Sequence, residues 1–261
     1  MGARRLGQHF LRDRDVAARI AELLAIEPGE SVLEIGGGRG ALTEHLVGRG
    51  ARLAVAELDD ALADRLEARF GAAVEVLRGD VLDLSLAALG GDERWVVAGN
   101  LPYYATSPIV AWLCEQWRHV ARAALMMQLE VAERLVAPPG SRVIGRMSVL
   151  VQLRATARIV LRVQPGSFLP PPNVQSAVVR FDFHQQPAAD VGDEGAFFSL
   201  VEQGFRHRRK TLAAALTMTG AGTRGEVDGW LAAAEVDGRR RAETLELAEW
   251  ARLNRAREAE R

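Results

Sequence analysis

The residues with the clearest capacity for chemistry form the stretch NLPYY at 100–104, after the apolar run WVVAG at 95–99. The amino nitrogen of adenine is a poor nucleophile because its lone pair is delocalised into the ring, so a catalyst must hold the amino hydrogens. Two acceptors suffice: the Asn100 side-chain oxygen and the backbone carbonyl of Leu101, beside a proline that has no amide hydrogen. The ring of Tyr103 can stack on a base. These candidate catalytic residues indicate a site that orients the exocyclic amino group of an aromatic base.

A glycine-rich turn lies within VLEIGGGRGALTEHL at 32–46, between a predicted strand and a predicted helix. Glycines permit the positive φ angles of a tight turn and let a ligand approach the backbone closely, so Gly36 and Gly38 are candidate cofactor-binding residues. The turn alone is ambiguous, since Gly36, Gly38 and Ala41 also satisfy a dinucleotide fingerprint. A tight turn without any ligand is the structural alternative.

Acidic residues stand at the ends of the next two predicted strands: Glu57 is the last residue of the second, and Asp80 follows the third. Glu57 could accept hydrogen bonds from both hydroxyls of a ribose, and Asp80 from an adenine amino group. Ligands of such sheets lie across the carboxyl ends of the strands, so both acids would face the crevice beside the glycines. Each acid could instead cap a helix. An adenosyl ligand without a pyrophosphate fits S-adenosylmethionine as well as NAD, but NLPYY has no role in hydride transfer, which disfavours an oxidoreductase.

Several segments, in this order, resemble the ribosomal RNA adenine dimethyltransferases. They are GQHFL (7–11), EIGGGRGALT (34–43), GNLPYY (99–104), EVAERL (130–135), GRMSVL (145–150) and FLPPPNVQSAVVR (168–180). The resemblance covers about residues 4–183. It continues through FRHRRKTL (205–212) and RRAETLELAEWARL (240–253), which are similar to the helical domain of the bacterial small-subunit branch.

The resemblance implies a site for S-adenosylmethionine, whose product is S-adenosylhomocysteine, and no metal. In the family the segment at His9–Leu11 closes over the cofactor, the glycines approach its amino-acid part, and the two acids take the ribose and the adenine. The implied cofactor-binding residues are His9, Leu11, Gly36, Gly38, Glu57, Asp80 and Asn100.

The resemblance also implies a pocket for a flipped base. Phe168 matches an aromatic residue on a Pro-rich loop that helps to hold the base opposite Tyr103, whereas Tyr104 is expected to pack in the interior. Two positions depart from the family: Gly37 stands where Pro is usual, which should loosen the cofactor turn, and His9 stands where many members have Asn.

The implied activity is dimethylation of the exocyclic N6 of two adjacent adenosines in the 3′-terminal hairpin of small-subunit ribosomal RNA, with a role in subunit biogenesis. The implied partner is that RNA in a pre-ribosomal 30S particle, and the protein would be a cytoplasmic monomer. Two alternatives remain open. One is a large-subunit adenine methyltransferase that confers macrolide resistance, and the other is an RNA-binding assembly factor with incidental methyl transfer.

The elements that must position these residues alternate along the first part of the chain. Apolar runs predict strands at 31–36, 52–57, 74–79, 95–99 and 123–128, with helical patterns such as 60–70 between them. Such alternation indicates a parallel sheet. Two further strands, at 157–163 and 176–183, have no helix between them and predict an antiparallel pair at one edge. The predicted class is α/β, a Rossmann-like class I methyltransferase sheet.

Composition changes at the polar segment 184–196, beyond which three stretches show helical periodicity only. We therefore expect a methyltransferase domain at 1–183 and a small all-α, RNA-binding domain at 184–261. Charge is distributed unevenly: residues 57–93 contain ten Asp or Glu and three Arg, whereas residues 118–180 contain nine Arg and two Glu. This asymmetry suggests a face that attracts phosphate. Candidate RNA-binding residues are Arg142, Arg146, Arg206, Arg208, Arg209 and Lys210.

Other features exclude whole classes of protein. The single cysteine, Cys114, cannot form an internal disulfide, and the five histidines do not fall at metal-ligand spacings. No apolar run approaches the ~18 residues of a membrane span. The first ten residues contain no apolar signal core. A reducing cytoplasm is the expected location.

Overall fold

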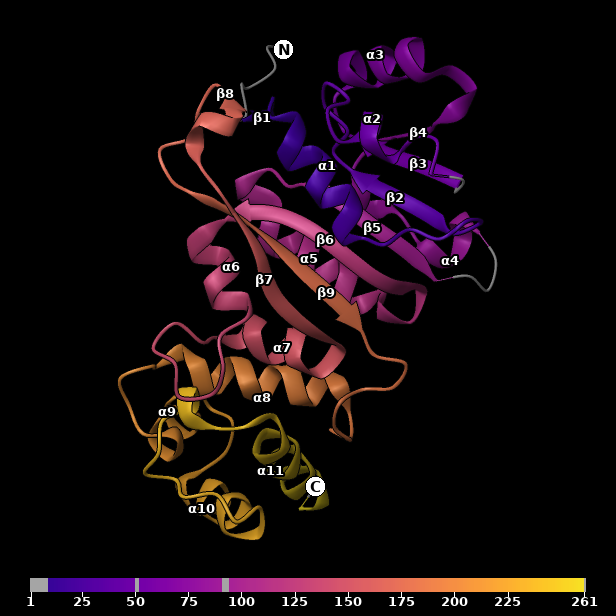
Figure 1. Ribbon diagram of the computed structural model, residues 1–261. Coiled ribbons are helices and arrows are strands. Elements are labelled where there is room, and N and C mark those ends of the chain that lie inside the picture. Colours follow the sequence, from indigo (N-terminus) through magenta and orange to yellow (C-terminus); the bar gives the residue numbers. More distant parts are fainter. Residues whose placement is uncertain (1–8, 50–51, 91–93, 261) are drawn as a thin grey trace. The chain divides into compact units, whose positions relative to one another are not determined.

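The computed structural model describes residues 9–49, 52–90 and 94–260, which form two compact units (Figure 1). The first unit contains the described residues up to Ala132 together with Thr156–Gln185, and the second contains Glu133–Ala155 and the residues from Gln186 onward. The chain thus passes into the second unit twice, once ahead of the expected boundary at 184. Most of the N-terminal segment inspected for a signal core, residues 1–8, lies outside the described residues.

A seven-stranded sheet forms the centre of the first unit, in the order β4-β3-β2-β5-β6-β9-β7. Its strands are β2 (Ser31–Ile35), β3 (Arg52–Glu57), β4 (Glu75–Arg78), β5 (Trp95–Asn100), β6 (Val120–Gln128), β7 (Ala155–Val163) and β9 (Ser176–Phe183). The five strands from β4 to β6 are parallel to their neighbours, whereas β9 runs antiparallel to β6. The predicted strands and fold class are confirmed.

The central strands are buried on both faces, which explains their continuous apolar runs. Every residue of β2 is buried. In β5, Val96 and Ala98 join a core cluster with Ala17 and Ile20, from the helix that follows β1. Because side chains alternate along a strand, Val97 lies on the opposite face, where it is also buried. The fixed backbone of β5 sets the position of the residues that follow it.

Helices and one small sheet surround the seven strands. The helices are α1 (Arg14–Leu23), α2 (Thr43–Leu46), α3 (Asp60–Phe70), α4 (Leu86–Leu89), α5 (Thr106–Glu115) and α6 (Leu129–Leu135), the last of which ends in the second unit. Helix α3 has the predicted bounds. The small sheet pairs β1 (Phe10–Leu11) with β8 (Phe168–Leu169) in antiparallel register, and the sequence patterns gave no sign of it.

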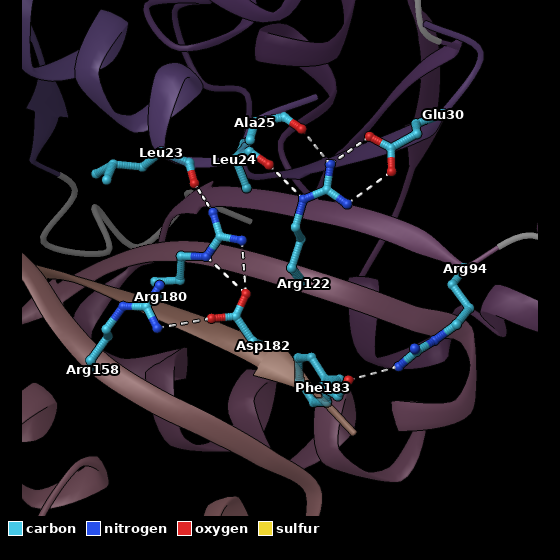
Figure 2. A network of polar contacts seen from close by, with 10 residues as sticks. All are labelled: Leu23, Leu24, Ala25, Glu30, Arg94, Arg122, Arg158, Arg180, Asp182 and Phe183. Atoms are coloured by element: carbon cyan, nitrogen blue, oxygen red, sulfur yellow. Dashed lines mark hydrogen bonds and ion pairs between the residues drawn. The ribbon is translucent and has the colours of Figure 1, made fainter. Parts of the chain in front are cut away.

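The carboxyl end of α1 is held by an arginine of β6 (Figure 2). Arg122 donates from Nε to the carbonyl of Leu24 (2.5 Å) and from Nη2 to the carbonyl of Ala25 (2.7 Å). The same guanidinium forms two bonds to the Glu30 carboxylate, at 2.8 and 2.5 Å. Helix α1 has no basic residue in its own last turn, so the cation that favours a helix carboxyl end comes from the sheet.

A second arginine, from β9, binds the carbonyl of the preceding residue at the same helix end. Arg180 donates to the carbonyl of Leu23 and to Asp182, whose carboxylate also pairs with Arg158 of β7 at 3.2 Å (Figure 2). Two strands that are distant in sequence from α1 therefore bind carbonyls at and just after its carboxyl end.

The second unit is helical. Its helices are α7 (Arg146–Arg154), α8 (Glu194–Arg206), α9 (Leu212–Met218), α10 (Arg224–Ala233) and α11 (Leu247–Ala259). Val149 and Leu153 of α7 pack in one cluster with Phe197 and Trp250, which explains why residues 133–155 lie with this unit and not with the first domain expected from the sequence. The first of the three stretches with helical periodicity, residues 197–216, is interrupted at 207–211, where Thr211 caps α9. In the ranges described, no helix has the length and apolarity needed to cross a membrane.

Candidate active site

A cavity of about 600 Å³ lies at the carboxyl ends of β2, β3, β4 and β5, entirely within the first unit. It brings together most of the residues proposed from sequence for cofactor binding and chemistry. These are His9, Gly36, Gly38, Glu57, Asp80, Asn100, Leu101 and Tyr103. Leu11 and Phe168 do not line it.

The glycine-rich loop has the backbone that the sequence predicts. Gly36 and Gly38 have φ angles of +75° and +54°. The amide of Gly36 donates to Ala56 O (2.8 Å), and that of Gly38 donates to Glu57 Oε2 (2.9 Å). Glu57 therefore holds the loop against the end of β3 while it lines the cavity.

Gly37 is closely packed in the loop. A Cβ atom there would lie 2.5 Å from Val55 Cγ1 and 2.8 Å from Leu66 Cδ1, and both side chains are buried. The expectation that glycine in place of the usual proline loosens this turn stays a prediction. The contacts show that a side chain at position 37 would require Val55 and Leu66 to shift.

Both carboxylates of the cavity also make local backbone contacts. Glu57 Oε1 accepts from the amide of Asp59 (3.0 Å), and Asp80 Oδ1 accepts from the amide of Leu82 (3.0 Å), where it caps a 3₁₀ turn. For Asp80 the capping alternative and the cavity position hold together, because a carboxylate can accept about four hydrogen bonds. For Glu57 the capping alternative is wrong, since Asp59 caps α3.

Two apolar residues beside these acids were missed in the sequence. Leu58 is 54% exposed and Leu82 is 37% exposed, and both line the cavity. Exposed apolar side chains within a cavity are typical of surfaces that cover the faces of a flat ring. Their positions could have identified them in the sequence: Leu58 directly follows Glu57, and Leu82 lies two residues after Asp80.

A further carboxyl group, Glu34 of β2, lies beneath the loop and does not line the cavity. It is 1% exposed and accepts a hydrogen bond from the Thr43 hydroxyl at 2.6 Å. Burial, reinforced by the charge of Glu57, raises the pKa of Glu34 to about 7. The sequence analysis did not identify this group, because it lies within an ordinary strand pattern.

Asn100 has a fixed orientation at the end of β5. Its Nδ2 donates to the backbone carbonyl of His9 at 3.1 Å. Because a carbonyl can only accept, the amide nitrogen must face His9, and Oδ1 lies on the other side of the planar amide. The next residue, Leu101, is held by its own amide, which donates to Met126 O at 3.0 Å.

Tyr103 is held through its hydroxyl, which lies 2.8 Å from the hydroxyl of Ser176 on β9. Burial raises the pKa of the Tyr103 phenol, so it remains protonated at neutral pH, although the bond to Ser176 acts in the opposite direction. Tyr104 is 56% exposed and lines the cavity, so its expected packing in the interior is wrong.

Phe168 lies in the core and is only 2% exposed. It pairs with Leu11 across the β1–β8 sheet, and the alternation of that short strand exposes Leu169 instead. Strand pairing and burial thus place the Phe168 ring away from the cavity.

The proposed RNA-binding cations belong to the second unit, and all six are exposed. Arg208 donates to Arg142 O at 2.7 Å, which brings the segment after α8 beside the segment before α7. Arg146 pairs with Glu202 at 3.3 Å. Exposed guanidinium groups of this kind can exchange a surface partner for a phosphate at little cost.

Comparison with known proteins gives a consistent result. A family model described as ribosomal RNA adenine dimethylase matches residues 2–253. A ribosomal RNA small subunit methyltransferase A from Anaeromyxobacter dehalogenans is 45% identical over 260 residues, which are 96% of this chain and 91% of the relative. A protein of the same name from Geobacillus kaustophilus is 39% identical over 264 residues, covering 96% and 89%.

Solved structures agree on the fold. The crystal structure of the 23S rRNA methyltransferase ErmE has a TM-score of 0.71 at 29% identity and covers 95% of this chain and 99% of its own. A dimethyladenosine transferase from Plasmodium falciparum has a TM-score of 0.77 at 23% identity, with coverages of 94% and 96%. At that identity the second likeness shows the fold alone.

Proposed function

Because the chain belongs to the ribosomal RNA adenine dimethylase family, we propose that it transfers two methyl groups from S-adenosylmethionine to the N6 amine of adenosines in small-subunit ribosomal RNA. Near full-length likeness to small-subunit enzymes, at up to 45% identity, favours this RNA over the large-subunit alternative. The targets are two adjacent adenosines in the 3′-terminal hairpin, within a pre-ribosomal 30S particle. The protein acts as a cytoplasmic monomer.

The cavity fits S-adenosylmethionine. The positive φ angles of Gly36 and Gly38, and the absence of side chains there, allow close approach of its amino-acid part. Glu57 offers acceptors to ribose hydroxyls, Asp80 offers one to the adenine amine, and the exposed Leu58 and Leu82 offer apolar contact to the ring. When bound, S-adenosylmethionine supplies an electrophilic methyl group on a sulfonium.

The residues after β5 hold the amine that reacts. Asn100 Oδ1 and the carbonyl of Leu101 accept hydrogen bonds from the two N–H groups of this amine, and Tyr103 presents a neutral ring to the base. Both acceptors are uncharged, so they orient the amine and do not remove its proton. Positioning of this kind can supply up to ~7–11 kcal/mol of the rate enhancement.

The second unit grips the RNA backbone in this proposal. Its six exposed cations contact phosphates, while loop bases that are splayed out of structured RNA can enter the cavity. In this proposal, the methyl transfer contributes to biogenesis of the small ribosomal subunit.

The observation that best supports the proposal is the orientation of the Asn100 amide in the same cavity as Glu57 and Asp80. The test incubates the protein and radiolabelled S-adenosylmethionine with small subunits from a strain that lacks this methylation. Nucleoside analysis should find dimethyladenosine, and primer extension should place it at the 3′-terminal hairpin.

Three controls sharpen this test. Asn100→Ala should lower transfer by about 100-fold or more, as expected for loss of a group that positions the amine. Large subunits should not be labelled, and their labelling instead would support the large-subunit alternative. If Asn100→Ala fully restores subunit assembly in cells, RNA binding and not methyl transfer is the essential function.

A further inference from the structure

His9 connects three parts of the active-site wall. Its backbone carbonyl accepts from Asn100 Nδ2 (3.1 Å), and its ring nitrogen Nδ1 lies 2.8 Å from the carbonyl of Pro170. Its ring also packs on Tyr103, with 5.5 Å between the ring centroids and an angle of 35° between the planes. Segments 91 and 161 residues distant along the chain therefore meet at one residue.

The bond to Pro170 determines which ring nitrogen bears the proton. A backbone carbonyl can only accept, so Nδ1 of His9 is the donor. β1 pairs with β8 directly beside this bond, with Phe10 opposite Leu169, so the same two segments are joined at adjacent positions. The position of the His9 carbonyl is fixed in turn, and with it the direction of the Asn100 amide.

The Tyr103 ring is fixed by the same residue. Ser176 holds its hydroxyl, and His9 contacts its ring. A rotation of the ring would break one contact or the other. His9 thus contacts both side chains that hold the reacting base in the proposed mechanism.

We propose that His9 is a positioning residue, which orients Asn100 through its carbonyl and Tyr103 through its ring, in addition to its place in the wall of the cofactor cavity. This inference rests on the proposed function, in which Asn100 and Tyr103 hold the adenine. It makes the Pro-rich loop at 170 a support of the catalytic residues.

The kinetic test compares His9→Ala with His9→Asn and with a matched histidine variant in the same unit, His119→Ala. His9→Ala should lower kcat, measured at saturating S-adenosylmethionine, by between about 10-fold and 100-fold; the Kd for S-adenosylmethionine is measured separately by calorimetry. His9→Asn should recover part of kcat, because an amide can still donate to the Pro170 carbonyl. His119→Ala should match the wild type. A loss of cofactor affinity at unchanged kcat, or no change in either, would overturn the proposal.

A second measurement does not depend on activity. In ¹⁵N-labelled protein the side-chain NH₂ signals of Asn100, assigned by their absence in Asn100→Asp, should shift in His9→Ala and stay in place in His119→Ala. Signals that do not move in His9→Ala would overturn the positioning role. If the wild-type protein transfers no methyl group, the proposed function is refuted. The NMR measurement still tests whether His9 orients Asn100, because it does not depend on activity.

Discussion

The hydroxyls of Tyr103 and Ser176 lie 2.8 Å apart, although 73 residues separate them along the chain. Ser176 is fully buried at the start of β9, and Tyr103 lies in the turn after β5. This bond joins the antiparallel end of the sheet to the aromatic residue of the proposed base pocket.

A double-mutant cycle measures this bond. Ser176→Ala leaves the Tyr103 hydroxyl without its partner and should lower the free energy of unfolding by about 1–2 kcal/mol. Adding Tyr103→Phe removes the stranded group, so the double variant should lose less than the sum of the two single losses. Urea unfolding of the four proteins gives the coupling energy. Strictly additive losses would contradict the bond.

Glu34 should make stability depend on pH. Its pKa is raised from its ordinary value near 4.5 to about 7, so its contribution to stability is fully present below pH 4.5 and is lost as pH rises through 7. The difference corresponds to on the order of 3 kcal/mol. Glu34→Gln should therefore lose less stability than the wild type between pH 5 and pH 8 in urea unfolding. Parallel losses in the two proteins would show that Glu34 does not titrate in this range.

Gly37→Ala should be destabilising. The new methyl group would overlap Val55 and Leu66, which are buried and cannot move freely, and overpacking of this kind costs about 1–3 kcal/mol. Gly166→Ala is the matched control, since a Cβ atom there meets nothing within 4 Å and its φ is not positive. Thermal melting should separate the two variants, and equal melting temperatures would disprove close packing at Gly37.

Arg122→Met should cost about 2 kcal/mol of unfolding free energy, because it strands the carbonyls of Leu24 and Ala25 and the Glu30 carboxylate. Arg122 is also the main cause of the lowered pKa of Glu30. Arg158→Met removes an ion pair whose arginine is 58% exposed and should change stability by less than about 1 kcal/mol. Similar losses in the two variants would mean that the α1 contacts of Arg122 add no stability.

The basic residues of the second unit should set the salt dependence of RNA binding. Arg209→Ala and Lys210→Ala should each reduce the slope of log K against log salt by about 0.7–0.9. Arg224, which pairs with Asp228 on α10, is the control position. Filter binding to the 3′-terminal hairpin at several salt concentrations measures the slopes. A slope that changes equally in Arg224→Ala would point to general electrostatics and not to a defined contact.

Local patterns predicted much of the fold and part of the site. Buried strands show continuous apolar runs, and cavity residues such as Gly36, Glu57 and Asn100 could be predicted because they lie at the carboxyl ends of these strands. The β1–β8 pair consists of two-residue strands, which have no detectable period. Phe168 was assigned to the base pocket by its motif, but pairing with a distant segment places it in the core. The contacts of His9 arise from neighbours far along the chain, which periodicity cannot reveal.

The arginines that hold α1 lie far downstream of the helix they complete. Arg122 comes 98 residues after Leu24, and Arg180 comes 157 residues after Leu23. During synthesis, the end of α1 has neither partner until most of the first unit has left the ribosome. The N-terminal segment that contacts Asn100 is thus among the first residues made, yet the carboxyl end of the helix behind it gains its last arginine only after β9 has been made.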